Sequence, residues 1–446
     1  MLKVRPFLLL ILCFSVLLNA YANVNTFALF TEQNGSNASI THGKAVSINR
    51  SIKAAKIGQK ITVDLLNGES LILTVTTKDR KANGTVVINA TNSEQTSMIL
   101  TIGKRQTFGS IDGPDFSYSL GFSPESGPLL MDNRNTDASR VRLENDMRFP
   151  PRTSNKPRLS EQQQAEKSKN KESNDIQDSK PDSHELVNPP ADMTMLVVYS
   201  PEFAAGFGND PESRIEQAIA FTNVALTSTG IDAQFRLVGT QEIDFNNSLT
   251  AGTLLNQATF ATGAFTSLPD LRNQFGADMV SVLAYRSDFA PDSDFAANGV
   301  AWVNGDNPNF GFSVTRLSLF CCDSVFAHEL GHNLGSGHER TSVSGNAPGS
   351  CSGGFTGFSC GHGVSGNFDT IMSRNVGTSI NRFSNPSQRC NGLPCGIAQN
   401  QANAADNFTS FNISGFLVEQ FRDNVTSPSP SDAVVPPFLF LLLDDD

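Results

Sequence analysis

Short hydrophobic runs dominate the first part of the chain. Between residues 25 and 130, β-branched and aliphatic residues cluster at 61–65, 71–75, 86–88 and 98–102. Asn67-Gly68 separates the first two runs and is typical of a tight hairpin turn. This pattern predicts a small β-rich module over residues 23–134.

A different pattern begins at residue 191. Residues 193–199 are typical of a buried strand, and Asp210-Pro211 indicates the start of a helix, because proline is favoured at the first helical position. Apolar residues then keep the 3.6-residue helical period. Further strands are expected at 233–238, 278–285 and 299–303, and an amphipathic helix at about 402–421. Alternating strands and helices predict an α/β (α+β) domain with a mixed sheet over residues 191–424.

Residues 135–190 separate these two parts. The stretch 152–183 is almost entirely polar, with Leu159, Ala165 and Ile176 as its aliphatic residues. So few apolar side chains do not offset the entropy of an ordered chain. We therefore expect a disordered, charged linker that proteases reach, with lysines at 167, 169, 171 and 180 as activation sites.

The N-terminus indicates export. Residues 1–22 contain Lys3 and Arg5, an apolar stretch of about a dozen residues and the sequence Ala20-Tyr21-Ala22, as in a cleaved signal peptide. An uncleaved anchor is the alternative, and the short stretch argues against it. We expect a protein that is secreted, either extracellular or periplasmic in transit.

Six cysteines follow the signal, all in the last third of the chain: 321, 322, 351, 360, 390 and 395. An even set in an exported protein suggests disulfides. Six cysteines allow 15 pairings, and the short spacings make local loops between Cys351 and Cys360 and between Cys390 and Cys395 plausible. A cysteine metal site is the alternative, but no CxxC pair occurs. The chain ends with residues 425–446, a Ser/Pro spacer and a short apolar tail.

Charge narrows the choice of partners. The formal net charge is -11, and residues 191–424 contain ten arginines and no lysine. Binding to phosphate backbones needs a basic face, so we expect no nucleic-acid partner. No apolar run approaches the roughly 20 residues of a membrane-spanning helix, so we expect no integral membrane span.

The candidate chemistry lies in residues 328–338. His328 and His332 are four residues apart, so a helix would place both on one face, where their nitrogens can bind one Zn²⁺. Gly335 can end the helix with a positive φ and bring His338 in as a third ligand. Glu329 would stand beside the metal. Three protein ligands leave a fourth position for water, as in catalytic zinc sites.

Two simpler interpretations fit these residues less well. Ordinary helix residues would rarely place three of the chain's six histidines in eleven residues at ligand spacing with a glutamate beside the first. A purely structural zinc would need a fourth protein ligand. An open zinc site polarises a carbonyl and acidifies water, and Glu329 can act as general base and acid in hydrolysis.

The motif HExxHxxGxxH resembles the signature of the metzincin clan of zinc endopeptidases, and HELGHNLG is similar to its secreted bacterial reprolysin/adamalysin branch. Asp369 to Ser373 resembles the Met-turn, which implies that Met372 forms a hydrophobic floor beneath the histidines. The resemblance covers residues 191–424 and implies a metzincin-type fold with an active-site helix. It also implies that Gly299 to Val303, including Trp302, is the edge strand that holds an extended peptide.

The chain departs from the branch pattern at two positions. Glu339 follows the third histidine where reprolysins carry Asp, and Arg374 stands where astacins place a metal-binding Tyr. The resemblance places Arg374, Arg382 and Arg389 in the specificity segment, where arginines can pair with an acidic substrate side chain; solvated surface arginines are the alternative.

His362 is interpreted as an ordinary loop histidine. Calcium binding by residues 288, 292 and 294 has weak support.

Together these features predict a secreted zinc endopeptidase made as a proenzyme. It would act on protein or peptide substrates, with its own propeptide as inhibitor, and linker cleavage would free the active form. Residues 23–320 contain no cysteine, so a thiol cannot mask the zinc, and the N-terminal module would have to use another ligand or its bulk. The alternatives are a non-catalytic zinc-containing adhesin or binding module of metzincin shape, and a zinc hydrolase of non-peptide amides.

Overall fold

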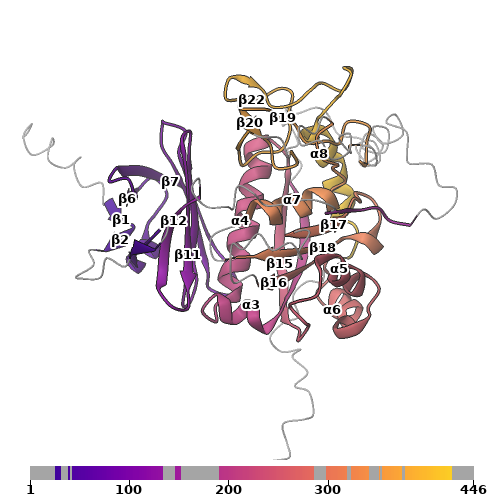
Figure 1. Ribbon diagram of the computed structural model, residues 1–446, viewed down its shortest axis with the longest axis horizontal. Coiled ribbons are helices and arrows are strands. Elements are labelled where there is room, and N and C mark those ends of the chain that lie inside the picture. The colour runs from indigo at the N-terminus through magenta and orange to yellow at the C-terminus, as the bar shows by residue number, and fades with distance from the viewer. Residues whose placement is uncertain are drawn as a thin grey trace, which may run out of the picture.

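A computed structural model describes residues 26–31, 39–40, 43–133, 146–151, 190–285, 298–318, 323–340, 351, 354–373 and 377–423. The described residues within 26–133 form one sheet-containing part, here called the β-domain, and those within 146–151 and 190–423 form a second, here called the C-terminal domain (Figure 1). The predicted signal peptide, most of the linker and the tail lie outside the described residues.

The β-domain is built on a ten-stranded sheet in the order β1-β6-β7-β8-β9-β10-β11-β12-β4-β3. Its strands are β1 (Thr26–Ala28), β3 (Ser39–Ile40), β4 (Gly43–Ala45), β6 (Lys60–Asp64), β7 (Ser70–Arg80), β8 (Val86–Thr91), β9 (Ser97–Ile102), β10 (Thr107–Gly113), β11 (Phe116–Ser123) and β12 (Gly127–Asp132). A small pair, β2 (Phe30–Thr31) and β5 (Ser47–Ile48), and the 3₁₀ helix η1 (Arg50–Ala54) complete it. The four predicted runs are confirmed as strands, and Gly68, at φ 87°, turns the chain between β6 and β7.

The C-terminal domain contains a mixed six-stranded sheet in the order β13-β17-β18-β16-β14-β15. The strands are β13 (Met147–Arg148), β14 (Ala191–Tyr199), β15 (Ala233–Glu242), β16 (Met279–Tyr285), β17 (Gly299–Trp302) and β18 (Phe312–Leu317). All neighbours are parallel except β17 and β18. A small three-stranded sheet follows, formed by β19 (Gly363–Val364), β20 (Phe368–Asp369) and β21 (Thr378–Ser379), and then a pair, β22 (Arg389–Cys390) and β23 (Leu393–Pro394).

The helices of this domain are α3 (Pro201–Gly206), α4 (Pro211–Thr229), α5 (Ala251–Thr259), α6 (Leu268–Gln274), α7 (Asp323–Asn333) and α8 (Asn407–Val418), with 3₁₀ turns η4 (Gly263–Phe265) and η5 (Pro308–Phe310). Helix α4 begins with proline after Asp210, as predicted, and ends at Gly230 with φ +84°. Helices α4, α7 and α8 pack on one face of the sheet, and α5 and α6 pack on the other, in separate apolar clusters.

Two predictions need correction. The last helix begins at Asn407 rather than near Ala402, because Asp406 caps it by accepting a hydrogen bond from Thr409 N at 3.0 Å, while Ala405 pairs with Ile397. Residues 146–151 were assigned to the disordered linker, yet the structure places β13 on the edge of the mixed sheet. This segment is ordered because its main chain forms hydrogen bonds with β17, and the local composition does not reveal such contacts with a distant strand.

The β-domain packs on helix α4. Figure 1 shows α4 between the β-domain sheet and the sheet of the C-terminal domain. Val87, Ile99 and Phe108 of the β-domain belong to the same buried apolar cluster as Phe207 and Ile215 of the C-terminal domain. The two parts therefore share a continuous apolar core.

Two carboxyl groups at this contact predict a pH-dependent stability. Burial raises the pKa of Glu216 on α4 to about 7, against the attraction of Lys81 and with further repulsion from Asp79 and Glu212. Burial also raises the pKa of Asp112 to about 6, and the hydrogen bond from Ser117 opposes this rise, to which the charge of Asp323 adds.

A carboxyl whose pKa is raised in the folded state stabilises that state most below its unfolded pKa, and this stability is lost as pH rises through the folded pKa. We expect the free energy of unfolding to fall by about 2–3 kcal/mol between pH 4.5 and 7.5 through Glu216. Denaturant titrations across this range check this, and Glu216→Gln should flatten the profile. A profile that is equally steep in the variant would contradict the assignment.

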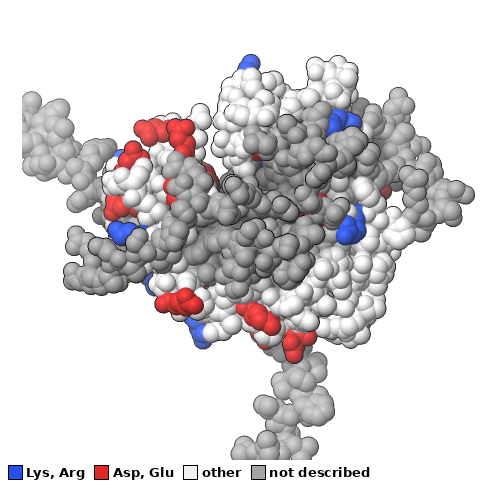
Figure 2. Space-filling view, in the orientation of Figure 1, with Lys and Arg blue, Asp and Glu red and all other residues white. Residues whose placement is uncertain are grey.

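On the face shown in Figure 2, acidic side chains gather on the β-domain, while basic side chains stand singly. Among the residues that the structure describes, no helix combines the length and the apolarity that crossing a membrane requires.

Candidate metal centre

Helix α7 presents the first two histidines. It runs across the mixed sheet, and Asn333 Nδ2 fixes its last turn by donating to the carbonyls of Trp302 and Phe312 at 3.0 and 2.9 Å. Gly335 has φ +91°, as predicted, and turns the chain so that His338 returns toward the helix. His328 and His332, four residues apart, lie on the same face, and all three histidines are buried.

Backbone carbonyls orient two of the rings. His328 Nδ1 lies 2.7 Å from the carbonyl oxygen of Ile371, and His332 Nδ1 lies 2.7 Å from that of Ser336. These contacts assign the proton to Nδ1 and leave Nε2 as the metal-binding nitrogen. Burial, together with the charges of His328 and His338, lowers the pKa of His332 well below its usual value, which favours the neutral imidazole that a metal requires.

The side chain of Asp146 lies among the three histidines. Its carboxylate oxygens are 3.1 Å from His338 Nε2, 3.4 Å from His328 Nε2 and 3.9 Å from His332 Nε2. Burial alone would raise the pKa of this carboxyl, but His338 and His328 outweigh it and hold the pKa well below its usual range. Sequence reasoning missed Asp146, because a lone acidic residue near a polar linker carries no ligand spacing.

These four side chains fit a zinc ion. Zn–N and Zn–O bonds of about 2.0–2.2 Å in a tetrahedron place the ligand atoms about 3.3 Å apart. The Nε2 atoms of His328 and His338 are 3.2 Å apart, and all four ligand atoms lie within 4.8 Å of one another. His332 Nε2 is buried and has no hydrogen-bond partner among the described residues. The donor set of three imidazoles and one carboxylate is one that zinc accepts.

Asp146 reaches the histidines because the chain around it pairs with β17. Ala301 N donates to the carbonyl of Asp146 at 2.9 Å, and Val303 N donates to that of Arg148 at 2.7 Å. Strand β13 runs parallel to β17, and Figure 1 shows its purple segment beside β17, away from the β-domain. The edge of the mixed sheet is therefore covered by residues 146–148.

Glu329 lies between α7 and β17. Its side chain is fully buried, and a Cβ added at Gly299 would lie 2.3 Å from Glu329 Oε1 and 2.7 Å from its Cδ. Glycine at this position of β17 therefore leaves the room that the carboxylate occupies. Met372 lies beneath the helix, fully buried, and a Cβ at Gly331 would meet its Sδ at 2.3 Å.

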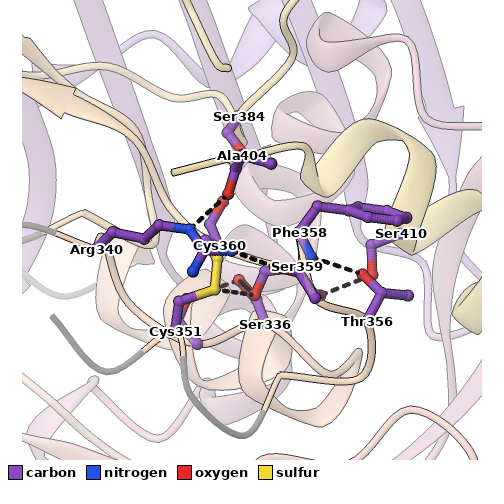
Figure 3. The surroundings of a disulfide bond; sticks show 12 residues. Ser336, Arg340, Cys351, Thr356, Phe358, Ser359, Cys360, Ser384, Ala404 and Ser410 are labelled. Carbon is purple, nitrogen blue, oxygen red and sulfur yellow. Dashed lines mark hydrogen bonds between the residues drawn. A yellow bond between two sulfur atoms is a disulfide. The ribbon is translucent and has the colours of Figure 1, made fainter. Parts of the chain in front are cut away.

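A disulfide supports the loop that carries His338. Cys351 pairs with Cys360, and Cys390 pairs with Cys395, which confirms the two local pairings expected from spacing; Cys321 and Cys322 lie outside the described residues. Figure 3 shows the first disulfide between Ser336 and Arg340. Gly337 N donates to Ser359 O at 2.8 Å, and Ser384 Oγ donates to Cys360 O at 2.6 Å. These contacts join the turn before His338 to the segment that precedes Met372.

Other candidate residues lie further from the histidines or outside the description. Trp302 turns its ring into the α5 cluster, where Nε1 donates to Thr259 Oγ1 at 2.8 Å. His362 is half-buried and does not belong to the histidine cluster, and burial lowers its pKa. Arg374 and the proposed calcium ligands 288, 292 and 294 lie outside the described residues.

Arg382 lies next to the Met372 segment. Its carbonyl accepts a hydrogen bond from Ile371 N at 2.9 Å, and its Nη1 donates to Gln388 Oε1 at 3.0 Å. Arg389 is exposed and donates to the carbonyl of Gly392 at 2.7 Å.

A helix with two histidines, a glycine turn, a third histidine and a methionine beneath them is the arrangement of a metzincin-like zinc metalloprotease domain. Residues 190–384 match the family described as metallo-peptidase family M12, reprolysin type. Residues 190–384 are thus similar to zinc metallopeptidases of this family, and the buried group of Asp146 and three histidines is the candidate zinc site.

The chain is also similar in sequence to named metalloendopeptidases of bacteria. A peptidyl-Asp metalloendopeptidase of Pseudomonas aeruginosa is 28% identical over 270 residues, covering 56% of this chain and 44% of the relative. One of Stenotrophomonas maltophilia is 25% identical over 224 residues, covering 48% and 50%. The chain thus spans about half the length of these relatives. Metalloproteinase-II of Bacteroides fragilis, a solved structure, is 12% identical with a TM-score of 0.36, covering 64% of this chain and 82% of that one.

Proposed function

We propose that this protein is a secreted, zinc-dependent endopeptidase that is made as a proenzyme. The observation that supports it best is the convergence of His328, His332 and His338 beside the buried carboxylate of Glu329. The two described disulfides are compatible with export.

Each residue has a defined part in the proposed reaction. The Nε2 atoms of the three histidines would hold the zinc, which would supply polarisation of the scissile carbonyl and acidification of water. Glu329 accepts a proton at its carboxylate from the attacking water and delivers it to the leaving nitrogen. The N–H groups of Ala301 and Val303 hold the main chain of the substrate along β17, where they now hold residues 146–148. Met372 supports the helix from below.

The proenzyme part of the proposal rests on Asp146. Its carboxylate would serve as a fourth ligand in place of water if zinc is bound by the three histidines, and β13 occupies the edge where an extended substrate would lie. Residues 146–148 therefore supply the blocking ligand that a chain without a propeptide cysteine requires.

Hydrolysis of casein or gelatin by the activated protein, with zinc content measured, tests the function. We expect one zinc per chain, activity that a chelator abolishes, and recovery when zinc is returned. A folded, zinc-loaded and activated protein that cuts neither substrate would instead favour a binding module of the same shape.

The surroundings of Arg382 predict that the enzyme prefers substrates with an acidic side chain. The main chain of Arg382 pairs with the Met372 segment, its guanidinium binds the neutral Gln388, and no carboxylate among the described residues forms an ion pair with it. The names of the relatives in Pseudomonas and Stenotrophomonas refer to peptidyl-Asp bonds. A hydrogen bond to a charged group contributes about 1.5–3 kcal/mol, which is about ten- to a hundredfold in kcat/KM.

We expect Arg382→Ala to reduce the ratio of kcat/KM for a peptide with Asp to that for the matched Asn peptide by about this factor. Arg389→Ala, an exposed arginine in the same segment, is the control and should leave the ratio unchanged. An equal loss on both peptides would mean that Arg382 only supports the fold.

A further inference from the structure

We infer that the β-domain is held on the C-terminal domain by a docking surface of its own, so that cutting the linker leaves the protein latent with the β-domain retained as a bound inhibitor. The latency rests on the proposed function, whereas the docking does not. Linker cleavage alone, expected from the sequence to free the active form, would then be insufficient.

The docking surface has an apolar centre. Val87, Ile99 and Phe108 come from the neighbouring strands β8, β9 and β10, and their exposures are 6%, 3% and 2%. Phe108 packs edge-on against Phe207 at 5.8 Å, and the guanidinium of Arg214 on α4 lies 6.0 Å from the Phe108 ring. Arg214 in turn pairs with Asp323, the first residue of α7. The β-domain therefore contacts Phe207 and Arg214, and Arg214 connects this contact to the first residue of α7, the helix that carries His328 and His332.

A polar anchor, formed by hydrogen bonds to Asp210, fixes the orientation of the β-domain at this contact. The Asp210 carboxylate accepts hydrogen bonds from the backbone N–H groups of Arg105 and Gln106 at 2.7 and 2.8 Å. Arg50 fixes the same turn from within the β-domain, since its guanidinium donates to the carbonyls of Gly103 and Arg105 at 2.5 and 2.8 Å. The turn 103–106 is thus a receptor for one carboxylate of the other domain.

The polar anchor also explains why residue 103 is a glycine. A Cβ at Gly103 would lie 1.6 Å from Ser213 Oγ and 2.6 Å from Asp210 Oδ2, both in the C-terminal domain. Gly103 does not have a positive φ, so its own backbone does not require glycine. Nearby, Thr101 Oγ1 donates to Gln217 Oε1 at 2.7 Å in a fully buried contact. Close approach of the two domains is what excludes a side chain at position 103.

The two contacts of the N-terminal part are separate. Figure 1 shows the β-domain against α4 on one side of the C-terminal domain and β13 beside β17 on another. Both precede residue 152, so a cut anywhere in 152–189 breaks neither contact. Because residues 134–145 connect them, docking of the β-domain keeps the effective concentration of Asp146 at the histidines high.

The test uses the full chain with one recognition sequence for a site-specific protease placed between Lys167 and Lys171. The nicked, zinc-loaded protein is passed over a sizing column without denaturant, and peptidase activity is measured at nanomolar concentration. We compare the wild type with Gly103→Val and with Asp210→Ala, which weaken the docking from either side. Ile57→Ala, at a residue that is 66% exposed on the β-domain, is the control.

We expect the two wild-type fragments to elute together, with at least tenfold less activity than the nicked Gly103→Val or Asp210→Ala protein, whose fragments separate. The control should behave as the wild type. Wild-type fragments that separate on nicking, with activity rising to the level of the variants, would overturn the inference. Fragments that stay together in the wild type and separate in the variants, without activity in any sample, would uphold the docking and reject the peptidase function.

Discussion

Replacing Glu329 by glutamine is expected to lower kcat/KM of the activated protein by about 10²–10⁴-fold, the usual contribution of a general base. Glutamine keeps the shape of the side chain in the space left by Gly299 but cannot take a proton. Because Glu329 is not one of the converging ligand atoms, the variant should still bind one zinc. Kinetics on a fluorogenic peptide and zinc analysis of the same sample provide the measurement.

Glu242→Gln makes the same chemical change at an exposed position of β15 and serves as the control. Full activity of the zinc-loaded Glu329→Gln protein would rule out the proposed base. Loss of zinc together with activity would assign Glu329 to the support of the metal site instead.

Asp146→Ala should have the second large effect, in the opposite direction. Removing one partner of a buried charged contact costs about 2–5 kcal/mol, so the population of precursor with an open cleft should rise about 30-fold or more. The uncut variant should therefore hydrolyse a short peptide, whereas the uncut wild type should be almost inactive. The rate before any linker cleavage is the quantity to compare, and electrophoresis confirms that the chain is intact.

Asp115→Ala removes an exposed carboxylate from the same part of the chain and should leave the precursor inactive. Zinc content separates the outcomes further, since three histidines remain in the Asp146 variant. An intact, zinc-loaded Asp146→Ala precursor that stays as inactive as the wild type would show that β13 blocks the cleft by bulk, without help from this carboxylate.

The sequence predicted those features that depend on neighbours along the chain. Alternation and turn residues located β6 to β9, proline after Asp210 marked the start of α4, and spacing placed His328 and His332 on one helix face. Gly335 was expected to have a positive φ because a helix that must turn back within a few residues needs one. Local periodicity and backbone sterics carry this information.

Features that depend on contacts between distant segments were not predictable in this way. Asp146 and His338 are far apart in sequence, and their proximity follows from the pairing of β13 with β17, a strand of two residues too short to show a pattern. Trp302 looked like a residue for substrate contact, but strand alternation turns its ring toward α5. The start of α8 was likewise set by a single cap at Asp406.

Strand β13 has a consequence for the tendency of the protein to self-associate after the proposed activation. With residues 146–148 in place, β17 is not the last strand of the mixed sheet. Their removal would leave the N–H groups of Ala301 and Val303 without strand partners on an open sheet border, which is the kind of surface that pairs with other chains. On the proposed function, the same border would bind substrates and would also favour self-association, so the precursor would be the form suited to storage and transit, and the activated form to dilute surroundings.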